Sequence, residues 1–415
     1  MQHWAVFITN DSNKSRFVHN LLAAIVSELP LPKNYKGALF SKLALERFMD
    51  EENRHGTKII TQGTQQSLRS MSSGEQKKAL LNHLFEKNND YIILDNPFDN
   101  LDLESQKKLF NDLKDKADQI VFIQIISRKV DLLPFITNFA SLSKEKLSIL
   151  QNLDEAFSAE KNSHFHGRIP PPLEPIEFPY NLLIKLKDIT VRFGDKTVLK
   201  NINWEINKGE FWQLIGKNGS GKTTILSMIT GENPKGYGQE LFLFGRKKGS
   251  GESIWDIKQK IGYFTPAMTD KFAGYHSIEN MLISGFNDSI GLYMKPTEAQ
   301  LRLAKEWLML INLWEIKDSL FHDLSMGQKR LVMTIRAMIK HPLLLILDEP
   351  TAGLDDASSK LLVSLVNKIA KESNTATLFV SHRKEPGLEP DLVYELQSHE
   401  EGSTGKVVTQ KLPRF

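Results

Sequence analysis

The feature that most constrains the fold of this chain is a glycine-rich segment near its middle. Residues 216–223 read Gly-Lys-Asn-Gly-Ser-Gly-Lys-Thr and match the pattern GxxxxGK[ST] in full. In this pattern the glycines let backbone N–H groups close around a phosphate at the first turn of a helix. The segment therefore predicts an α/β fold in which a strand leads into a phosphate-binding loop.

Composition sets limits on the rest of the molecule. The chain has 415 residues, which leaves room for two domains with sizeable cores. Its net charge of +3 does not indicate a nucleic-acid binder, and the absence of cysteine excludes disulfides and cysteine-based zinc sites. Residues 1–8 lack the basic start of a signal peptide, and no apolar run reaches the roughly 18–20 residues of a membrane span. Any membrane association is therefore expected to come through a partner.

Three further motifs follow the loop. Residues 324–328 read Leu-Ser-Met-Gly-Gln, the apolar run 343–347 ends at Asp348 and Glu349, and His382 follows a second apolar run. The first apolar run is typical of a buried parallel strand. These motifs, in this order after the phosphate loop, resemble the nucleotide-binding domain of ATP-binding cassette (ABC) proteins. The resemblance implies a P-loop NTPase fold with an antiparallel β-subdomain and a helical subdomain, and ATP hydrolysis that depends on Mg²⁺.

The resemblance also implies roles for individual residues. Phe193 would stack on adenine, although a hairpin core residue is the alternative. Asp348 would hold Mg²⁺ with Thr223, Glu349 would polarise the attacking water, and His382 would contact the γ-phosphate. The other expected nucleotide contacts lie in and just after the loop: Gly216, Asn218, Gly219, Ser220, Gly221, Lys222 and Thr224.

Two departures from the family pattern stand out. Met326 replaces the first glycine of the signature motif. The stretch Ile-Gly-Tyr-Phe-Thr-Pro at 261–266 resembles the approach to the Q-loop, but Pro266 or a neighbour stands where the family has glutamine. Because that glutamine normally links the magnesium site to the helical subdomain, its loss argues against ordinary coupling to a transporter.

The chain contains an internal repeat. Residues 71–76 resemble a second signature, and residues 91–97 resemble a second magnesium-binding strand end. The signature serine precedes the strand-end aspartate by 23 residues in both copies, and a further aspartate follows seven residues later in both. We therefore expect a shortened cassette domain at 1–148, a Pro-rich linker at 149–180 and a complete cassette domain at 181–415.

The first copy is expected to be degenerate. Residues 8–15 align with the phosphate loop and keep Lys14, but all three glycines are replaced. Asn13 tolerates a left-handed backbone, whereas Ile8 is poorly suited to one, and Asp11 would place negative charge near a polyphosphate. Asn96 stands in the place of the catalytic glutamate and cannot act as a base. We therefore predict that this half does not hydrolyse ATP.

Cassette domains pair head to tail, so that each ATP lies between one phosphate loop and the opposite signature. The resemblance therefore implies that the first-domain signature, Ser72, Ser73, Gly74 and Glu75, contacts the ATP of the second domain. One composite site would be competent and the other degenerate. Pairing within one chain or between two chains is left open, and a purely structural first domain is the alternative.

A narrower resemblance is to the ModF-type tandem ATP-binding proteins associated with molybdate transport. It is carried by residues 284–291, residues 341–350 and the missing glutamine. It implies a cytoplasmic ATPase, free or peripheral at the inner face of the plasma membrane, whose partner is a transmembrane transport subunit. The alternative is a soluble mechanochemical or regulatory ABC ATPase on ribosomes or nucleic acid. The short Pro-rich linker argues against that alternative, and Glu349 and His382 argue against a regulator that does not hydrolyse ATP.

Overall fold

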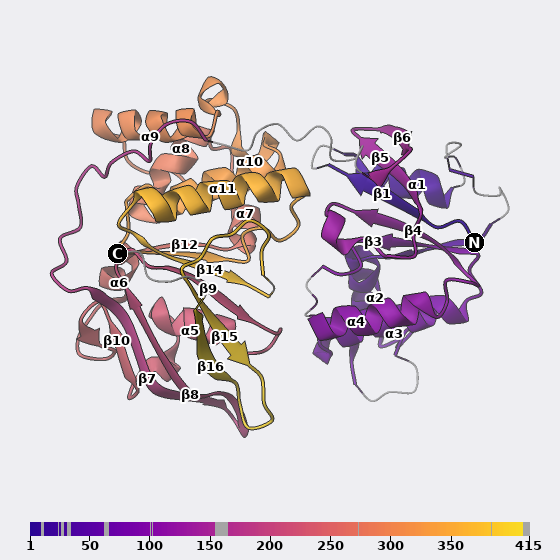
Figure 1. The fold of residues 1–415 in the computed structure, drawn as a ribbon, viewed down its shortest axis with the longest axis horizontal. Helices are drawn as coiled ribbons and strands as arrows, with labels where there is room; N and C mark the ends of the chain where they lie inside the picture. The colour runs from indigo at the N-terminus through magenta and orange to yellow at the C-terminus, as the bar shows by residue number, and fades with distance from the viewer. Residues whose placement is uncertain are drawn as a thin grey trace. The chain divides into compact units, whose positions relative to one another are not determined.

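A computed structural model describes residues 1–9, 12–23, 25, 29–30, 35–61, 66–99, 101, 103–153, 165–272, 274–382 and 384–409. Asp11 and the aspartate at position 102, both used in the sequence predictions, lie outside these residues. The chain divides into two compact units (Figure 1). The first comprises Met1–Asn162 and Gly353–Ala357, and the second comprises Ser163–Ala352 and Ser358–Phe415.

The second unit is built on a six-stranded mixed sheet. Five neighbouring strands are parallel, and the last edge strand is antiparallel. In spatial order the strands are β12 (Ile261–Phe264), β13 (Leu344–Asp348), β14 (Ala376–Ser381), β9 (Phe211–Gly216), β15 (Leu392–Gln397) and β16 (Thr404–Thr409). The four apolar residues of β13 are completely buried, which explains its unbroken apolar sequence.

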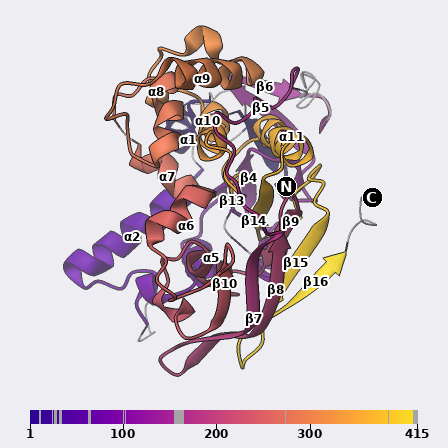
Figure 2. The ribbon, with the colours of Figure 1, turned by 90° about the vertical axis from the view of Figure 1, so that its left-hand side faces the viewer.

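A smaller antiparallel sheet precedes this one along the chain. Its order is β11 (Arg246–Lys247), β10 (Glu240–Leu243), β7 (Leu182–Phe193) and β8 (Lys196–Asn207). Gly194 and Asp195 make the tight turn between β7 and β8. The two sheets share a core, because the ring of Trp204 stacks on Tyr394 at 4.4 Å, and β8 lies beside β16 (Figure 2).

Seven α-helices complete the second unit as described. They are α5 (Lys222–Ile229), α6 (Ile254–Lys260), α7 (Pro266–Lys271), α8 (Ile278–Ile283), α9 (Glu298–Leu310), α10 (Met326–Met338) and α11 (Asp356–Glu372). Helices α8, α9 and α10 pack together, with Trp307 fully buried in α9. Thr297 and Ser325 begin α9 and α10 with reciprocal capping hydrogen bonds, which satisfy backbone donors that a helix start leaves unpaired.

The first unit repeats the strand order of the second. Its sheet runs β2 (Gly37–Phe40), β3 (Tyr91–Asp95), β4 (Val121–Ile126), β1 (Trp4–Ile8), β5 (Asn138–Ser143) and β6 (Lys146–Leu150). Only the last pair is antiparallel, as in the second unit. Its α-helices are α1 (Lys14–Leu22), α2 (Lys42–His55), α3 (Ser73–Glu86) and α4 (Leu103–Lys114).

The equivalence of the two sheets extends to individual residues. Trp4 in β1 and Trp212 in β9 each precede the aligned lysine by ten positions. The first unit, over its described residues, has no antiparallel sheet corresponding to β7, β8, β10 and β11. No described helix is both long and apolar enough to cross a bilayer.

Candidate active site

The predicted site residues of the second unit follow three neighbouring strands. Strand β14 lies between β13 and β9, with Asp348 beside Val380 and Ser381 beside Ile215. Because the three strands are parallel, their carboxyl ends meet at one edge of the sheet. This edge therefore brings together Asp348 and Glu349, His382 and the glycine-rich loop.

The three loop glycines serve two different purposes. Gly219 (φ 76°) and Gly221 (φ 94°) have left-handed backbone, which costs a glycine little. A Cβ on Gly221 would also lie 2.5 Å from Leu199 Cδ2 in β8. Gly216 ends β9 without a left-handed backbone, but a Cβ there would lie 2.6 Å from the Ser220 hydroxyl oxygen. A left-handed backbone thus explains two of the glycines, and close packing explains the third.

The loop fits a bound phosphate. The hydroxyl of Ser220 is buried and has no hydrogen-bond partner among the described residues. A Cβ on Gly219 would meet no atom of the described residues within 4 Å. Lys222 directs its ammonium group to the loop and donates to the carbonyl oxygens of Gly216 at 2.7 Å and Lys217 at 3.3 Å. The loop thus combines a positive charge, an unsatisfied donor and a left-handed turn at a helix start, which together suit an anion.

The positions that follow the loop lie on the first turn of α5. Thr223 is exposed and Thr224 is half-buried, while Asn218 is exposed in the loop itself. An exposed threonine hydroxyl next to the lysine can reach a cation held on the phosphate side. The structure therefore leaves Thr223 available for the predicted magnesium role.

Asp348 occupies the end of β13 in a shielded environment. Its pKa is raised to about 6, chiefly by burial and also by the neighbouring Glu349, while Lys222 and a hydrogen bond from Tyr263 oppose the rise. The Tyr263 hydroxyl donates to Asp348 Oδ2 at 3.4 Å. A cation would favour the ionised form of this carboxyl group, so Asp348 fits the role of a magnesium-binding residue.

Glu349 and His382 form a pair beside this carboxylate. His382 Nδ1 lies 3.1 Å from Glu349 Oε2, and both side chains are largely but not fully buried. Glu349 has a left-handed backbone (φ 51°), while its amide donates to the carbonyl of Val380 at 2.9 Å. The bend turns the glutamate out of the strand and towards the histidine. A carboxylate held by a histidine at this edge can orient a water molecule.

Phe193 ends β7 at the tip of the hairpin. Its ring is 48% exposed, so the alternative that it is a core residue is wrong. Lys235 Nζ lies 5.8 Å from the ring centroid. The same hairpin touches the loop through Leu199, which places an exposed aromatic ring on the element that borders the phosphate site.

The described residues of the aligned loop in the first unit differ in conformation from their counterparts in the phosphate loop. Asn13 has φ −80°, so it does not adopt the left-handed backbone that asparagine tolerates. Ile8 simply ends β1, and its counterpart Gly216 needs space rather than a left-handed φ, so the conformational objection to Ile8 is also wrong. The amide of Asn13 donates to the carbonyl of Lys144 at 2.7 Å, in the β5–β6 turn. A backbone donor that would face a phosphate is therefore already bonded within the unit.

The aligned lysine is paired directly with the strand-end aspartate. Lys14 Nζ lies 3.0 Å from Asp95 Oδ1. The next residue, Asn96, has φ 43° and donates its amide to Ile125 O at 2.9 Å, as Glu349 does to Val380. The backbone of the first unit thus repeats that of the second at this point, while the carboxylate is missing.

Both signature serines cap helices. Ser72 and Glu75 form a capping box at the start of α3, in which the Ser72 hydroxyl donates to Glu75 Oε2 at 2.7 Å and lowers the pKa of that carboxyl group. Ser73 and Gly74 lie in the first turn of α3. Met326 occupies the first position of α10, where the replaced glycine would lie, and the cap made by Ser325 is intact.

The predicted Q-loop position begins a helix. Thr265 precedes α7, and Pro266 takes its first position, where a missing N–H costs nothing. Arg330 of α10 donates to Thr269 Oγ1 of α7 at 3.0 Å. The segment that carries glutamine in the family is therefore a short helix fixed to the signature helix.

Sequence reasoning missed two groups of residues near the site. In the sequence Tyr263 stands out only as part of the Q-loop approach, whereas the structure places it on β12 beside Asp348. A cation follows the signature serine by five residues in both units. Lys77 donates to the carbonyls of Pro97 and Asp99, and Arg330 donates to the carbonyl of Ala352 at 3.3 Å. The internal repeat could have revealed these cations, because Lys77 and Arg330 occupy the same position in the two copies.

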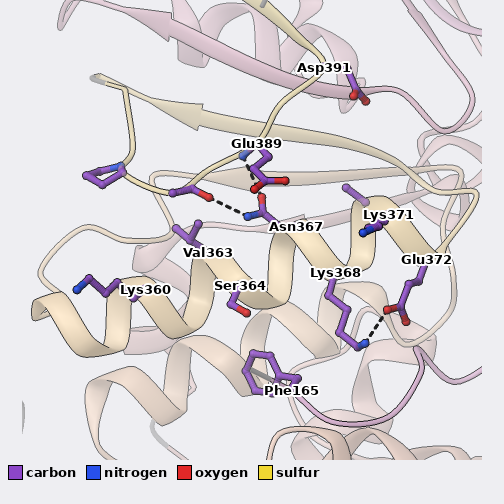
Figure 3. A pocket seen from close by; sticks show the side chains of 13 residues that line it. Phe165, Lys360, Val363, Ser364, Asn367, Lys368, Lys371, Glu372, Glu389 and Asp391 are labelled. Carbon is purple, nitrogen blue, oxygen red and sulfur yellow. Dashed lines mark hydrogen bonds and ion pairs between the residues drawn. The ribbon is translucent and has the colours of Figure 1, made fainter. Parts of the chain in front are cut away.

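A depression of about 590 Å³ lies elsewhere on the second unit, along α11 (Figure 3). Asn367 bridges its wall by donating to the carbonyl of Gly387 and accepting from the amide of Glu389. Lys368 is paired with Glu372 at 2.6 Å. No predicted site residue lines this depression, so its side chains are separate from the strand-end site. Within the described residues, no group of three or more His, Asp or Glu side chains could hold a metal ion.

Comparison with known proteins places these features in a family. The family description "ABC transporter" matches residues 199–352. The ABC transporter ATP-binding protein ModF of Escherichia coli (strain K12) is 33% identical over 436 residues, which cover 92% of this chain and 88% of that protein. An uncharacterized ABC transporter ATP-binding protein, C323.04 of Schizosaccharomyces pombe, is 29% identical and covers 76% of this chain and 66% of its own length. YlmA of Bacillus subtilis (strain 168), another uncharacterized ABC transporter ATP-binding protein, is 32% identical. The match covers 49% of this chain and 77% of YlmA.

Proposed function

Because the chain belongs to the ABC transporter ATP-binding protein family, we propose that its second unit binds ATP with Mg²⁺ and hydrolyses it. The observation that carries the proposal is the gathering of the Lys222 loop, Asp348 and the Glu349–His382 pair at three neighbouring strand ends. A glycine-rich turn alone would not need the other groups.

Each group has a chemical task in this proposal. Lys222 and the loop amides neutralise the phosphate oxygens, and Phe193 stacks on the base. Thr223 and Asp348 would hold Mg²⁺, which supplies charge for the oxygens of the transferred phosphoryl group. Glu349 accepts a hydrogen bond from the attacking water and orients it. His382 holds Glu349 and is placed to sense the γ-phosphate.

The first unit is proposed to lack hydrolytic activity. Lys14 is paired with Asp95, the Asn13 amide is bonded to Lys144, and Asn96 replaces the glutamate. A phosphate would have to displace these bonds before it could bind. We therefore expect Lys14→Ala to leave ATP affinity and turnover unchanged, whereas Lys222→Ala removes both.

The test of the central proposal compares ATP turnover and ATP binding in four proteins. The wild type should hydrolyse ATP in the presence of Mg²⁺. Glu349→Gln should lose at least about 100-fold in turnover and still bind ATP, because it removes the carboxylate that orients water. Asn96→Ala is the matched control in the first unit and should keep full turnover. Equal turnover in wild type and Glu349→Gln would overturn the assignment of Glu349.

Association with transport is proposed from the relatives. ModF and the other relatives are described as ABC transporter ATP-binding proteins, and we propose that this chain is likewise the cytoplasmic ATPase of a transport system with a transmembrane partner. The helix at Pro266, in place of the glutamine, favours the second candidate, a soluble mechanochemical or regulatory ATPase.

Fractionation of cells separates these two candidates. Tagged Glu349→Gln should accumulate in its ATP-bound form. Enrichment with one membrane complex, relative to wild type, would support the transport role and identify the partner. Enrichment on ribosomes or nucleic acid, or a protein that stays in the soluble fraction, would favour the second candidate.

A further inference from the structure

Tyr263 lies within reach of the magnesium-binding carboxylate because of the strand register. Tyr263 in β12 pairs with Ile346 in the parallel strand β13, and Asp348 follows two residues later. Residues two apart on a strand point to the same face, so Tyr263 and Asp348 are diagonal neighbours on one face of the sheet. A tyrosine is long enough to span this diagonal.

The two side chains are in direct contact. The Tyr263 hydroxyl donates to Asp348 Oδ2 at 3.4 Å, and the tyrosine ring is partly buried against the core of the second unit. Packing of the ring restricts the position of the hydroxyl. A carboxylate in a shielded position is oriented by the donors fixed beside it, and the Tyr263 hydroxyl is one of them.

The first unit provides an internal comparison. Leu39 in β2 occupies the register position of Tyr263, since it pairs with Ile93 two residues before Asp95. The leucine offers no donor, and there Asp95 is bound by Lys14 at 3.0 Å. In the second unit, Asp348 accepts from the tyrosine while the aligned Lys222 donates to loop carbonyls.

We propose that Tyr263 is a positioning residue for the magnesium-binding carboxylate. Its hydroxyl donates to Asp348 Oδ2, whereas in the first unit Lys14 contacts the equivalent Asp95. Tyr263 thus links β12 to the carboxylate at the end of β13. This inference rests on the proposed function of the second unit.

The test measures metal binding rather than turnover. The affinity for Mn²⁺ in the presence of a non-hydrolysable ATP analogue is followed by electron paramagnetic resonance in the full-length protein. Tyr263→Phe removes only the hydroxyl. Tyr263→Leu introduces the residue that the first unit has at the equivalent position, Leu39. We expect Mn²⁺ affinity to fall about tenfold in both, since loss of a group that orients a metal ligand has at least this effect. In EDTA, Tyr263→Phe should bind the analogue as the wild type does.

Tyr394→Phe is the matched control. The Tyr394 hydroxyl also makes one hydrogen bond, to Asn203 O at 2.9 Å, but it lies away from the carboxylate. The Tyr394→Phe variant should have unchanged Mn²⁺ affinity, and its melting temperature should fall at least as much as that of Tyr263→Phe. Unchanged Mn²⁺ affinity in Tyr263→Phe, or an equal fall in Tyr394→Phe, would overturn the proposal. Failure of the wild type to bind the analogue at all would instead overturn the proposed function.

Discussion

At the scale of single residues, Glu349 and Asn96 occupy equivalent strand ends with the same left-handed backbone. Asparagine adopts this conformation with less strain than glutamate does. The second unit therefore keeps a strained glutamate at the point where the proposed chemistry needs a carboxylate. The first unit instead has Asn96, which adopts the left-handed backbone with less strain.

We predict that Glu349→Asn stabilises the second unit by about 0.5–1 kcal/mol while it abolishes turnover, because it relieves backbone strain and removes the carboxylate. Urea unfolding measures the first effect and phosphate release the second. Asn96→Glu is the reverse exchange and should destabilise the first unit by a similar amount. Destabilisation by Glu349→Asn would show that the His382 contact outweighs the strain.

His341 is a second residue with unusual surroundings, and its burial changes the pKa of its imidazole ring. It precedes the strand leading to Asp348, and its buried Nε2 has no partner among the described residues. Burial lowers its pKa to about 4 from an ordinary value of 6.5, against a raising contact with the carbonyl of Pro170. The folded state therefore favours the neutral ring.

The stability contributed by a neutral His341 is fully present above pH 6.5 and is lost as the pH falls through 4. We predict a fall of up to about 3 kcal/mol in the free energy of unfolding over this range. His341→Asn should remove this part of the pH dependence, and asparagine suits the left-handed backbone there (φ 47°). Urea unfolding at several pH values checks the prediction, and identical pH profiles in the two proteins would contradict it.

At the scale of elements, α10 holds a short 3₁₀ turn, Ser284–Asn287, in place. Arg336 of α10 donates to Ser284 Oγ at 3.0 Å and to Ser289 O at 2.7 Å, and it is also stacked on Phe272. Gly285 lies so close to the helix that a Cβ would be 2.2 Å from Arg336 O. The segment noted for its family resemblance is thus a close-packed contact between backbones.

We predict that Gly285→Ala destabilises the second unit by about 2–4 kcal/mol, since the added methyl group would overlap backbone that cannot easily move. Thermal melting measures the loss. Asn287→Ala, an exposed position in the same turn, should be within about 0.5 kcal/mol of wild type. If Gly285→Ala left the melting temperature unchanged, the turn would be able to move away from α10 at little cost in free energy.

At the scale of the whole molecule, the family resemblance assigns the first unit a task despite its altered loop. Its signature serine keeps the capping geometry of the second unit, and Gly74 leaves room for Ser105, whose Oγ would be 3.0 Å from an added Cβ. Selection for a helix cap alone would explain the serine. A contribution to ATP turnover would explain the serine together with the glycine.

We predict that Ser72→Arg lowers ATP turnover of the full chain at least tenfold, because a bulky cation would replace the hydroxyl that the family uses on ATP. Ser70→Arg adds the same charge to an exposed position two residues earlier and should have little effect. Ser72→Asp, which can still cap α3, separates loss of the cap from loss of the hydroxyl. Wild-type turnover in Ser72→Arg would reduce the first unit to a structural role.

The sequence alone identified the motifs that consist of neighbouring positions in the chain. A glycine-rich loop, an apolar run ending in Asp348 and Glu349, and the equal spacings of the repeat are properties of neighbouring positions, and the phosphate loop needs no other part of the chain to be recognised. The strand–loop–helix order that they predict is the order found.

Only the tertiary structure decided what depends on strand register and on partners distant in sequence. Tyr263 meets Asp348, and Lys14 meets Asp95, because parallel strands bring together residues about 80 positions apart. The bond from the Asn13 amide to the carbonyl of Lys144 spans more than 130 positions. Side-chain spacing along the chain carries no record of such contacts, because register is set by the packing of the whole sheet.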